Sequence, residues 1–581
     1  MDIQDFVSSV NGELVGNDDF FSIDGFTGKF TFLHDAHTGD IVIREWIDPA
    51  GVEIAFNKNI ACLVTPNPRE GAIETAKRLN FPLIIINDMA DAEQYVIDYS
   101  INETLDDIDD LVEFVEGKLV GNDDFFSIDG FSGRFTFLND AHTGDIVIRH
   151  WIDGTGIEMA FNKNIACLIT QNPKDGAIEQ ANRLNFPLII TDKIELANAY
   201  ALSYTINHFS PTSTNVVITG TNGKSTTSHM IYHILKNAGY HVLTNTDSES
   251  EFNTLIDPMV CKLISDEIEA NGKIDYLVIE VSEVQGWLGN LMENHAALMS
   301  KAMRPRVGVI TNIAMDHIGL INSVDDVFNE LKSVPEAIGR GFTVLNYDDE
   351  LVRKLDAENP FYTSMSRLDE DNAVYFDGDK IMYENSPILT IDELPFTGNH
   401  FIQNILSAIG ACISLNIDMD SIVDGVKSYK ALNRRFAKLN DEPLIYDDFA
   451  HNPDGIKATI SETLKMLPEG QKLHVVCAIR GSRGIEINQL NVDALIESMT
   501  DDIELYLSSS NDVVNELNFV EEDEREVFFN TLNKNNIEYA HFDKLADCLR
   551  TVYNDADKKD IILLIGAQGM DPAESLLSDI I

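Results

Sequence analysis

The sequence predicts a multidomain α/β protein, with a duplicated small α/β head, a central domain built on a parallel sheet, and a carboxyl-terminal Rossmann-like α/β domain. Three observations predict this class. The length of 581 residues corresponds to three to five domains at about 150 residues each. A stretch of the head occurs twice, and beyond residue 210 strand-like runs alternate with helix-length segments.

The head is a tandem duplication with an offset of 105 residues. LVGNDDFFSIDGF occurs at 14–26 and again at 119–131, and DAHTGDIVIR occurs at 35–44 and again at 140–149. Within each copy, short apolar runs alternate with a helical stretch, which indicates a small α/β unit of about 100 residues. Two copies are too few for a solenoid.

The central segment is expected to form a mostly parallel sheet covered by helices. Its strand-like runs are 216–219, 276–282, 307–312 and 343–346, and VYFDGDKIMYE reads as a hairpin with an Asp-Gly turn. A second α/β series begins near Pro443 with PLIYDDF, LHVVCAI, IELYLSS and DIILLIG. These patterns predict four domains: 1–105, 106–210, 211–432 and 433–581.

Composition and charge exclude several classes of protein. Hydrophobic residues make up 44% and charged residues 24%, which is typical of a globular protein. The formal net charge of −54 disfavours general binding to nucleic acid or anionic membranes. The six cysteines form no CxxC pair, and neither a signal peptide nor an apolar run of about 18 residues is present. A cytoplasmic location without membrane insertion is expected.

A glycine-rich turn in ITGTNGKSTT, residues 218–227, is the strongest chemical signal. It follows the strand VVIT and opens a helix, so backbone NH groups and the helix amino end would cradle phosphates. Lys224 would neutralise the β and γ oxygens, and the Ser225 hydroxyl would ligate Mg²⁺. The alternative is an ordinary glycine-rich turn between a strand and a helix, without a bound phosphate. The expected ATP contacts here are Gly220, Thr221, Asn222, Gly223, Lys224, Ser225 and Thr226.

The tight form GTNGKST, with its first glycine four places before the lysine, resembles the Mur ligase superfamily of ATP-dependent amide-bond-forming ligases. Further segments resemble the family in the same order. YLVIEVS resembles the strand whose glutamate binds the nucleotide magnesium, which points to Glu280; a solvated strand-end acid is the alternative. ITNIAMDH resembles the signature whose histidine, here His317, helps to bind a second magnesium. Lys332 stands where many members have a carbamoylated lysine; a surface helix lysine is the alternative.

The resemblance continues into the second half of the chain. FTGNHFIQN resembles the loop at the adenine side, where His400 and Asn404 match and Phe401 replaces the usual first asparagine, so that Asn404 is expected to carry the adenine contact. Arg435 matches the arginine that meets the γ-phosphate, with Arg434 as a close competitor. DDFAHNP resembles the entrance to the family's last domain, which implies ATP or hinge contacts for Asp448 and His451; a purely structural aspartate in an Asn-Pro turn is the alternative.

The resemblance implies a reaction as well as a site. A substrate carboxylate would attack the γ-phosphate of ATP to give an acyl phosphate, and the amine of an amino acid would then displace phosphate. Two Mg²⁺ ions, Lys224, Glu280, His317, Lys332 and Arg435 would form the catalytic set, with Ser225, Glu280, His317 and carbamoylated Lys332 as metal ligands. In the last domain, RGSRG at 480–484 and LSSSN at 507–511 line up loosely with amino-acid-binding loops.

The head bears on the acceptor. DAHTGDIVIR and the strands after it resemble the domain that holds a UDP-linked precursor in muramoyl-peptide ligases, and the whole chain resembles archaeal pseudomurein peptide ligases. The expected partners are thus a UDP-linked peptide or glycan and a free amino acid, with residues 106–210 as the acceptor domain. The alternatives are a folylpolyglutamate-type or cofactor-amidating ligase, and a P-loop switch protein. The added amino acid and the oligomeric state cannot be predicted.

Overall fold

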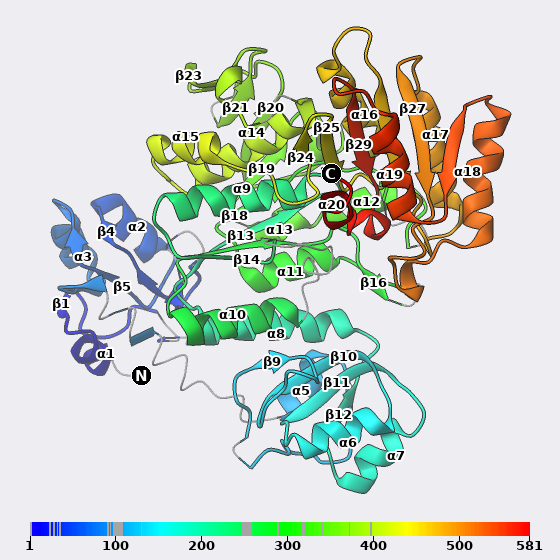
Figure 1. Ribbon diagram of the computed structural model, residues 1–581. Helices are drawn as coiled ribbons and strands as arrows, with labels where there is room; N and C mark the ends of the chain where they lie inside the picture. The colour runs from blue at the N-terminus through cyan, green and yellow to red at the C-terminus, as the bar shows by residue number, and fades with distance from the viewer. Residues whose placement is uncertain are drawn as a thin grey trace.

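The predicted multidomain α/β class is confirmed by a computed structural model of the chain (Figure 1). The structure describes residues 3–22, 25–26, 30–31, 33, 36–89, 92, 95–96, 108–128, 130–246, 258–287, 290–316, 320–339, 341–370, 372–395 and 398–581. Parallel strands dominate the large sheets, and helices cover their faces. Within the described part of the chain, every helix is too short or too polar to cross a bilayer.

The first copy of the head folds around a five-stranded sheet of order β1-β7-β5-β3-β2, beside a two-stranded sheet of β4 and β6. Its second helix, α2, begins with the side chain of Asp48 accepting a hydrogen bond from the Gly51 amide at 2.8 Å, a standard N-cap. Its elements are α1 (Ile3–Ser9), β1 (Glu13–Val15), β2 (Phe30–Thr31), β3 (Ile41–Ile43), β4 (Trp46–Ile47), α2 (Pro49–Asn57), β5 (Cys62–Thr65), β6 (Asn67–Pro68), α3 (Ala72–Leu79) and β7 (Leu83–Ile85).

The second copy repeats this arrangement in the order β8-β12-β11-β10-β9. Even the cap is repeated, because the side chain of Asp153 accepts from the Gly156 amide at 2.8 Å. The predicted boundary near residue 105 lies outside the described residues. The elements are α5 (Ile108–Phe114), β8 (Lys118–Val120), β9 (Phe135–Thr136), β10 (Ile146–Ile152), α6 (Gly154–Asn162), β11 (Cys167–Pro173), α7 (Ala177–Leu184), β12 (Leu188–Ile190) and α8 (Ile194–Phe209).

The central sheet has nine strands in the order β14-β15-β13-β18-β19-β20-β21-β22-β23. The predicted strands and the Asp-Gly hairpin are confirmed, and the hairpin supplies the antiparallel β21 and β22. The strands are β13 (Thr214–Thr219), β14 (Val242–Thr244), β15 (Tyr276–Glu280), β18 (Val307–Ile310), β19 (Phe342–Asn346), β20 (Asn359–Ser364), β21 (Ala373–Phe376), β22 (Lys380–Tyr383) and β23 (Ser386–Thr390), with β16 (Gly286–Trp287) and β17 (Asn290–Leu291) as a separate pair.

Helices on both faces cover this sheet. The amphipathic α9, which begins at the predicted phosphate-binding turn, packs against α14 and α15 on one face. The helices are α9 (Lys224–Asn237), α10 (Met259–Asn271), α11 (His295–Met303), α12 (Val324–Leu331), α13 (Val334–Ile338), α14 (Asn399–Ser414) and α15 (Met419–Ser428), with short 3₁₀ turns η2 (Val352–Lys354) and η3 (Ile391–Glu393).

The carboxyl-terminal domain is a six-stranded sheet of order β24-β25-β29-β26-β27-β28, and its four predicted strands are confirmed. Strands β24 and β28 were not predicted. The elements are β24 (Ala437–Asp441), β25 (Leu444–Asp448), α16 (Pro453–Met466), β26 (Leu473–Ala478), α17 (Ile485–Ser498), β27 (Ile503–Ser508), η4 (Glu516–Asn518), α18 (Glu522–Lys534), β28 (Tyr539–Phe542), α19 (Leu545–Asp555), β29 (Ile561–Ile565), η5 (Gln568–Met570) and α20 (Ala573–Ser578).

The second copy shares a hydrophobic core with the central domain. Its last helix, α8, packs against α10 and α11, and buried side chains from 108–206 belong to the same cluster as those of the sheet and helices beyond residue 216 (Figure 1). In contrast, the two buried clusters of the first copy contain only residues of that copy. The second copy is therefore a fixed part of the central body.

Candidate active site

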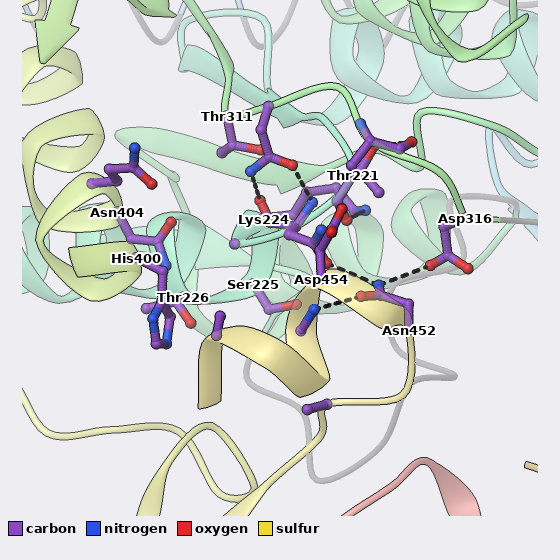
Figure 2. Close-up of a pocket in the computed structure, with 18 of the residues that line it drawn as sticks. Thr221, Lys224, Ser225, Thr226, Thr311, Asp316, His400, Asn404, Asn452 and Asp454 are labelled. Carbon is purple, nitrogen blue, oxygen red and sulfur yellow. Dashed lines mark hydrogen bonds between the residues drawn. The ribbon is translucent and has the colours of Figure 1, made fainter. Parts of the chain in front are cut away.

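A cavity of 520 Å³ lies where the central sheet meets the carboxyl-terminal domain (Figure 2). Parallel pairing aligns β13 with β15 and β18, so that Ile218 is opposite Glu280 and Thr219 is opposite Ile310. The carboxyl ends of these three strands therefore meet at one edge, where ligands of open α/β sheets bind. The first turn of α14 and the loop before α16 complete the lining.

The turn between β13 and α9 requires glycine at two places. Gly220 has φ +115°, and a Cβ there would lie 2.4 Å from the Thr311 hydroxyl. Gly223 has φ +83°, and a Cβ there would lie 2.2 Å from Oδ1 of Asn404. Both conformations and both close approaches exclude a side chain. The resulting loop points its backbone toward the cavity at the amino end of α9, which is the geometry of a phosphate site.

The loop is held from behind by the segment after β18. The side chain of Asn312 accepts from the amide of Asn222 at 2.9 Å and donates to its carbonyl at 2.8 Å. The hydroxyl of Thr221 donates to the Ala314 carbonyl at 3.1 Å and accepts from its amide at 3.0 Å. These paired bonds give Asn312 a positioning role that the sequence analysis did not assign. The Thr-Asn pair in ITNIAMDH was the sequence signal from which this role of Asn312 could have been predicted.

Lys224 lies under the loop, next to a buried acid. Its ammonium donates to the carbonyls of Gly220 and Thr221 at 2.7 and 2.9 Å and to the Glu283 carboxylate at 2.8 Å. Burial alone would lower the pKa of Lys224, but the charges of Glu283 and then Glu280 outweigh it and raise the pKa. Lys224 therefore stays cationic where phosphate would enter. Glu283, with a side chain 1% exposed, was not predicted, since no motif singles out a loop glutamate three residues after another.

Glu280 and Ser225 offer oxygen ligands to a divalent cation. Burial raises the pKa of Glu280, although the charges of Lys224 and Arg435 and the Ser225 hydroxyl oppose that rise. The amide of Glu280 donates to Asn245 at 2.8 Å, which fixes the end of β15. A carboxylate and a hydroxyl beside a phosphate site fit a hard cation such as Mg²⁺, because it prefers oxygen.

The first turn of α14 forms another wall of the cavity. Asn404 contacts the turn at Gly223, and the rings of His400 and Phe401 lie 4.0 Å apart between centroids. Burial lowers the pKa of His400, so the imidazole is neutral at physiological pH. Neutral rings and an amide suit contact with an uncharged base rather than with phosphate.

Two consecutive arginines take different places. Nη2 of Arg435 donates to the Ser225 hydroxyl at 3.0 Å and thereby reaches the cavity from the carboxyl-terminal side. Arg434 instead turns into the domain, where it pairs with Asp447 and Asp571 and donates to the carbonyls of Gly566 and Ala567. The structure thus places Arg435 in the cavity and Arg434 in a buried structural network.

The loop before α16 joins the two domains. Asn452 caps α16 by accepting from the Gly455 amide at 2.8 Å, and its Nδ2 donates to Oδ1 of Asn222 at 2.9 Å (Figure 2). Asp316 lies 3.4 Å from the same Nδ2, 3.7 Å from Nε2 of His451 and 3.6 Å from Nη1 of Arg480. One carboxylate of the central domain therefore faces three side chains of the other domain.

The predicted site residues divide into three groups. Lys332 ends α12, is exposed, and donates to the side chain of Asn329 at 3.1 Å, outside the cavity lining. His317 lies outside the described residues. In the described part of the chain, no group of three or more His, Cys, Asp or Glu side chains could hold a metal. The remaining predicted residues line the cavity, apart from Gly220 at the base of the loop: Thr221, Asn222, Gly223, Lys224, Ser225, Thr226, Glu280, Asn404, Arg435, Asp448 and His451.

Asp448, although it lines the cavity, is also engaged in the local fold. Its Oδ1 accepts from the Ala450 amide and from the Thr459 hydroxyl, both at 3.0 Å. Nδ1 of His451 lies 2.7 Å from the Phe449 carbonyl. Both residues therefore shape the loop that leads into α16. The sequence left two roles open for them, contact with ATP and a purely structural role, and this placement is compatible with either.

A second cavity of 390 Å³ lies in the second copy of the head, where it meets the central domain. Arg149, His150 and Trp151 on β10 form one side, Asn198 of α8 forms another, and Pro258 at the start of α10 closes it. Asp140 lines this cavity. His142 is not in the lining; its side chain is 83% exposed.

Comparison with known families covers both carboxyl-terminal parts of the chain. Residues 218–412 match the Mur ligase middle domain, and residues 434–568 match the Mur ligase glutamate ligase domain. The first match begins in β13 and includes the turn at Lys224. The second begins at Arg434 and ends at Gln568, just after β29. Both sides of the 520 Å³ cavity thus lie within matched regions.

Curated relatives share one activity in their names. The UDP-N-acetylmuramate-L-alanine ligase of Clostridium acetobutylicum is 28% identical over 382 residues, which cover 61% of this chain and 73% of that protein. The enzyme of the same name from Brachyspira hyodysenteriae is 26% identical over 371 residues, again 61% of this chain and 73% of that protein.

Solved structures share the fold. MurF from Acinetobacter baumannii superposes with a TM-score of 0.57 at 16% identity and covers 82% of this chain and 98% of its own. A pseudomurein peptide ligase type C from Methanothermus fervidus gives 0.51 at 18% identity and covers 93% and 100%. At these identities the likeness concerns the arrangement of the domains.

Proposed function

Because the chain carries both the middle and the glutamate ligase domain and thus belongs to the Mur ligase family, we propose that it is an ATP-dependent, ADP-forming ligase. It joins a free amino acid to a UDP-linked peptide or glycan precursor of a murein-like or pseudomurein cell wall. The curated relatives, which are named for ligation to a UDP-linked sugar acid, and the fold of a pseudomurein peptide ligase support this choice.

The observation that carries the proposal is the convergence of Lys224, Glu280 and Arg435 on one cavity shared by two domains. Acyl transfer through phosphate requires two anions, a carboxylate and a phosphoryl group, to approach each other. Two cationic side chains at the same place offset that repulsion. The glycine cradle at Gly223 and the oxygen ligands Ser225 and Glu280 fit ATP with Mg²⁺.

Each side chain then has a defined task. The backbone of the turn and the amino end of α9 bind the β and γ phosphates, and Lys224 stabilises the charge that develops during transfer. Arg435 brings a guanidinium fork to the transferring group from the other domain. Mg²⁺ bound by Ser225 and Glu280 would supply further neutralisation of phosphate charge. Asn404 and His400 contact the base. No protein nucleophile is needed, since the substrate carboxylate attacks.

The proposal includes a second Mg²⁺ ion. His317 and carbamoylated Lys332 are its proposed ligands, supported only by their matching positions in the sequence. In this structure Lys332 is exposed and outside the cavity lining, so metal binding would require the end of α12 to change position. Mass measurement of the intact chain for an added carboxyl group on lysine tests that step.

The acceptor and the amino acid are assigned to different domains. The cavity of the second copy is proposed to hold the nucleotide end of the acceptor, because that copy is packed against the central domain. The amino acid is proposed to bind near Arg480, which lines the main cavity from the carboxyl-terminal domain. A cytoplasmic site of action is part of the proposal and agrees with six buried free cysteines.

The deciding experiment is a screen of the purified protein for ATP hydrolysis in the presence of UDP-linked peptides and single amino acids, with mass analysis of the products. The expected product is one amide bond per ADP formed. Product with a folate or tetrapyrrole acid and none with UDP-linked acceptors would favour the folylpolyglutamate-type or cofactor-amidating alternative. Nucleotide binding without any ligated product would favour a P-loop switch protein.

A further inference from the structure

The duplicated head allows one copy to be compared with the other, position by position. Nine of the ten residues that line the 390 Å³ cavity lie within the second copy, and each has a counterpart 105 residues earlier. Six of these nine positions are identical in the two copies. They are Phe137, Leu138, Asp140, Ile148, Arg149 and Trp151, with counterparts Phe32, Leu33, Asp35, Ile43, Arg44 and Trp46.

Two of the three positions that differ change the charge. Asn139 corresponds to His34, but His150 corresponds to Glu45 and Asn198 to Glu93. Two uncharged hydrogen-bonding groups in the second copy are thus replaced by two acids in the first. The side chain of His150 is uncharged at neutral pH, because burial lowers its pKa to about 4. Asn198 is 1% exposed.

Both copies keep the same cation-aromatic arrangement. In the second copy, the guanidinium of Arg149 and the ammonium of Lys174 lie 5.2 and 4.2 Å from the ring centre of Trp151. In the first, Arg44 and Arg69 lie 5.1 and 3.8 Å from that of Trp46. In the second copy Arg149 and Asp140 are the charged residues of the cavity lining, and Lys174, outside the lining, adds a second cation over the ring of Trp151. By sequence, the first copy combines two cations with three carboxylates.

This difference decides which copy suits an anion. A diphosphate is attracted by cations opposed by one carboxylate, and two further acids at the corresponding positions of the first copy's sequence would repel it. We propose that His150 and Asn198 are the specificity-determining residues of the acceptor site, and that Glu45 and Glu93 exclude a nucleoside diphosphate from the first copy. The protein thus binds one UDP group per chain, in the second copy. This inference rests on the proposed function.

The attachment of the second copy supports the same assignment. Arg134 forms ion pairs with Asp266 and Glu269 of α10, and Pro258 of the same helix closes the cavity. An acceptor held there has a fixed geometry relative to the phosphate-binding turn, which ligation requires. The first copy's cores include no residue of the central domain.

The test is isothermal titration of the full-length protein with UDP. One site per chain is expected. His150→Glu, which installs the residue of the first copy, should weaken UDP binding at least about tenfold, since it places a like charge beside the diphosphate. Asn198→Asp should act in the same direction with almost no change of shape. Glu45→His in the first copy is the matched control and should leave the affinity of the second-copy site unchanged; because it removes one of the two excluding acids, the only change it can bring is an additional, weaker site. Thermal melts establish that each variant is folded.

The outcomes separate this inference from the function on which it rests. Two UDP sites per chain, or wild-type affinity in folded Asn198→Asp and His150→Glu, would overturn the assignment of specificity while leaving ligation possible. If His150→Glu does not fold, Asn198→Asp and the stoichiometry still decide. A protein that binds ADP but no UDP would remove the UDP-linked acceptor from the proposed function, and this inference with it.

Discussion

The side-chain amide of Asn452 donates a hydrogen bond of 2.9 Å to the side-chain oxygen of Asn222, and so ties the start of α16 in the carboxyl-terminal domain to the phosphate-binding loop. The same residue caps α16 through its oxygen. One side chain therefore serves two purposes with two different atoms, and a single substitution can separate them.

Asn452→Asp should impair the reaction without unfolding the domain. The new carboxylate keeps the oxygen that caps α16 but replaces the donor with an acceptor beside Asp316, so the two domains repel each other at this point. We expect turnover to fall about tenfold to a hundredfold, as for a lost positioning contact. Steady-state kinetics and the radius of gyration in solution with bound ADP measure the effect. Unchanged kinetics would show that this contact does not matter for the reaction.

Lys224→Ala should reduce turnover by about a hundredfold or more, because the ammonium lies where phosphate charge develops. The same change removes the Lys224 ammonium from beside the buried Glu283 carboxylate, so the melting temperature should fall as well. Adding Glu283→Gln should restore the melting temperature but not the turnover. If the double variant regains activity, Lys224 has no direct role in catalysis.

Arg434 and Arg435 should give opposite results. Arg434→Ala leaves Asp447 unpaired in the interior, which costs about 3 to 5 kcal/mol of unfolding free energy for a broken buried pair. Arg435→Ala should change stability by no more than about 1 kcal/mol. It should lower turnover about a hundredfold through the lost contact with the transferring group. Denaturant unfolding and kinetics on both variants check this, and the reverse pattern would exchange the two assignments.

His295 should make folding sensitive to acid. It is 1% exposed, and burial lowers its pKa from 6.5 to about 4. The folded state therefore binds fewer protons than the unfolded state between these values, and stability is lost as pH falls from 6.5 to 4. Over that range His295→Leu should lose up to about 3 kcal/mol less than wild type. His142→Leu, at an exposed position, is the control. Parallel curves would exclude His295 as a source of the slope.

Sequence patterns predicted the parts of the site that are local. The turn at Gly220 to Ser225 follows from a strand, glycines and a helix that are consecutive in the chain. Arg435 was placed beside the phosphate by resemblance, and the structure brings it within 3.0 Å of Ser225. The strand that carries Glu280 was predicted from a local pattern as well, since five consecutive apolar-rich residues specify a buried parallel strand.

Contacts between distant segments could not be predicted. Asn222 and Asn452 are 230 residues apart, and nothing in either motif specifies their pairing. Glu283 has no periodic pattern around it, and its importance depends on the position of Lys224 in space. For Lys332 the sequence matched a family position, but that match does not determine where the end of α12 points. The roles of His317 and Lys332 stay predictions.

Helix α8 belongs to the second copy by sequence and to the central domain by packing, since it lies against both α10 and α11. The span between the phosphate-binding turn and the cavity of the second copy is consequently set by a packed core. If the acceptor binds as proposed, a precursor one residue too short would leave its carboxylate short of the phosphate, and one residue too long would carry it past. The length of the precursor would then decide which stage of chain growth is accepted.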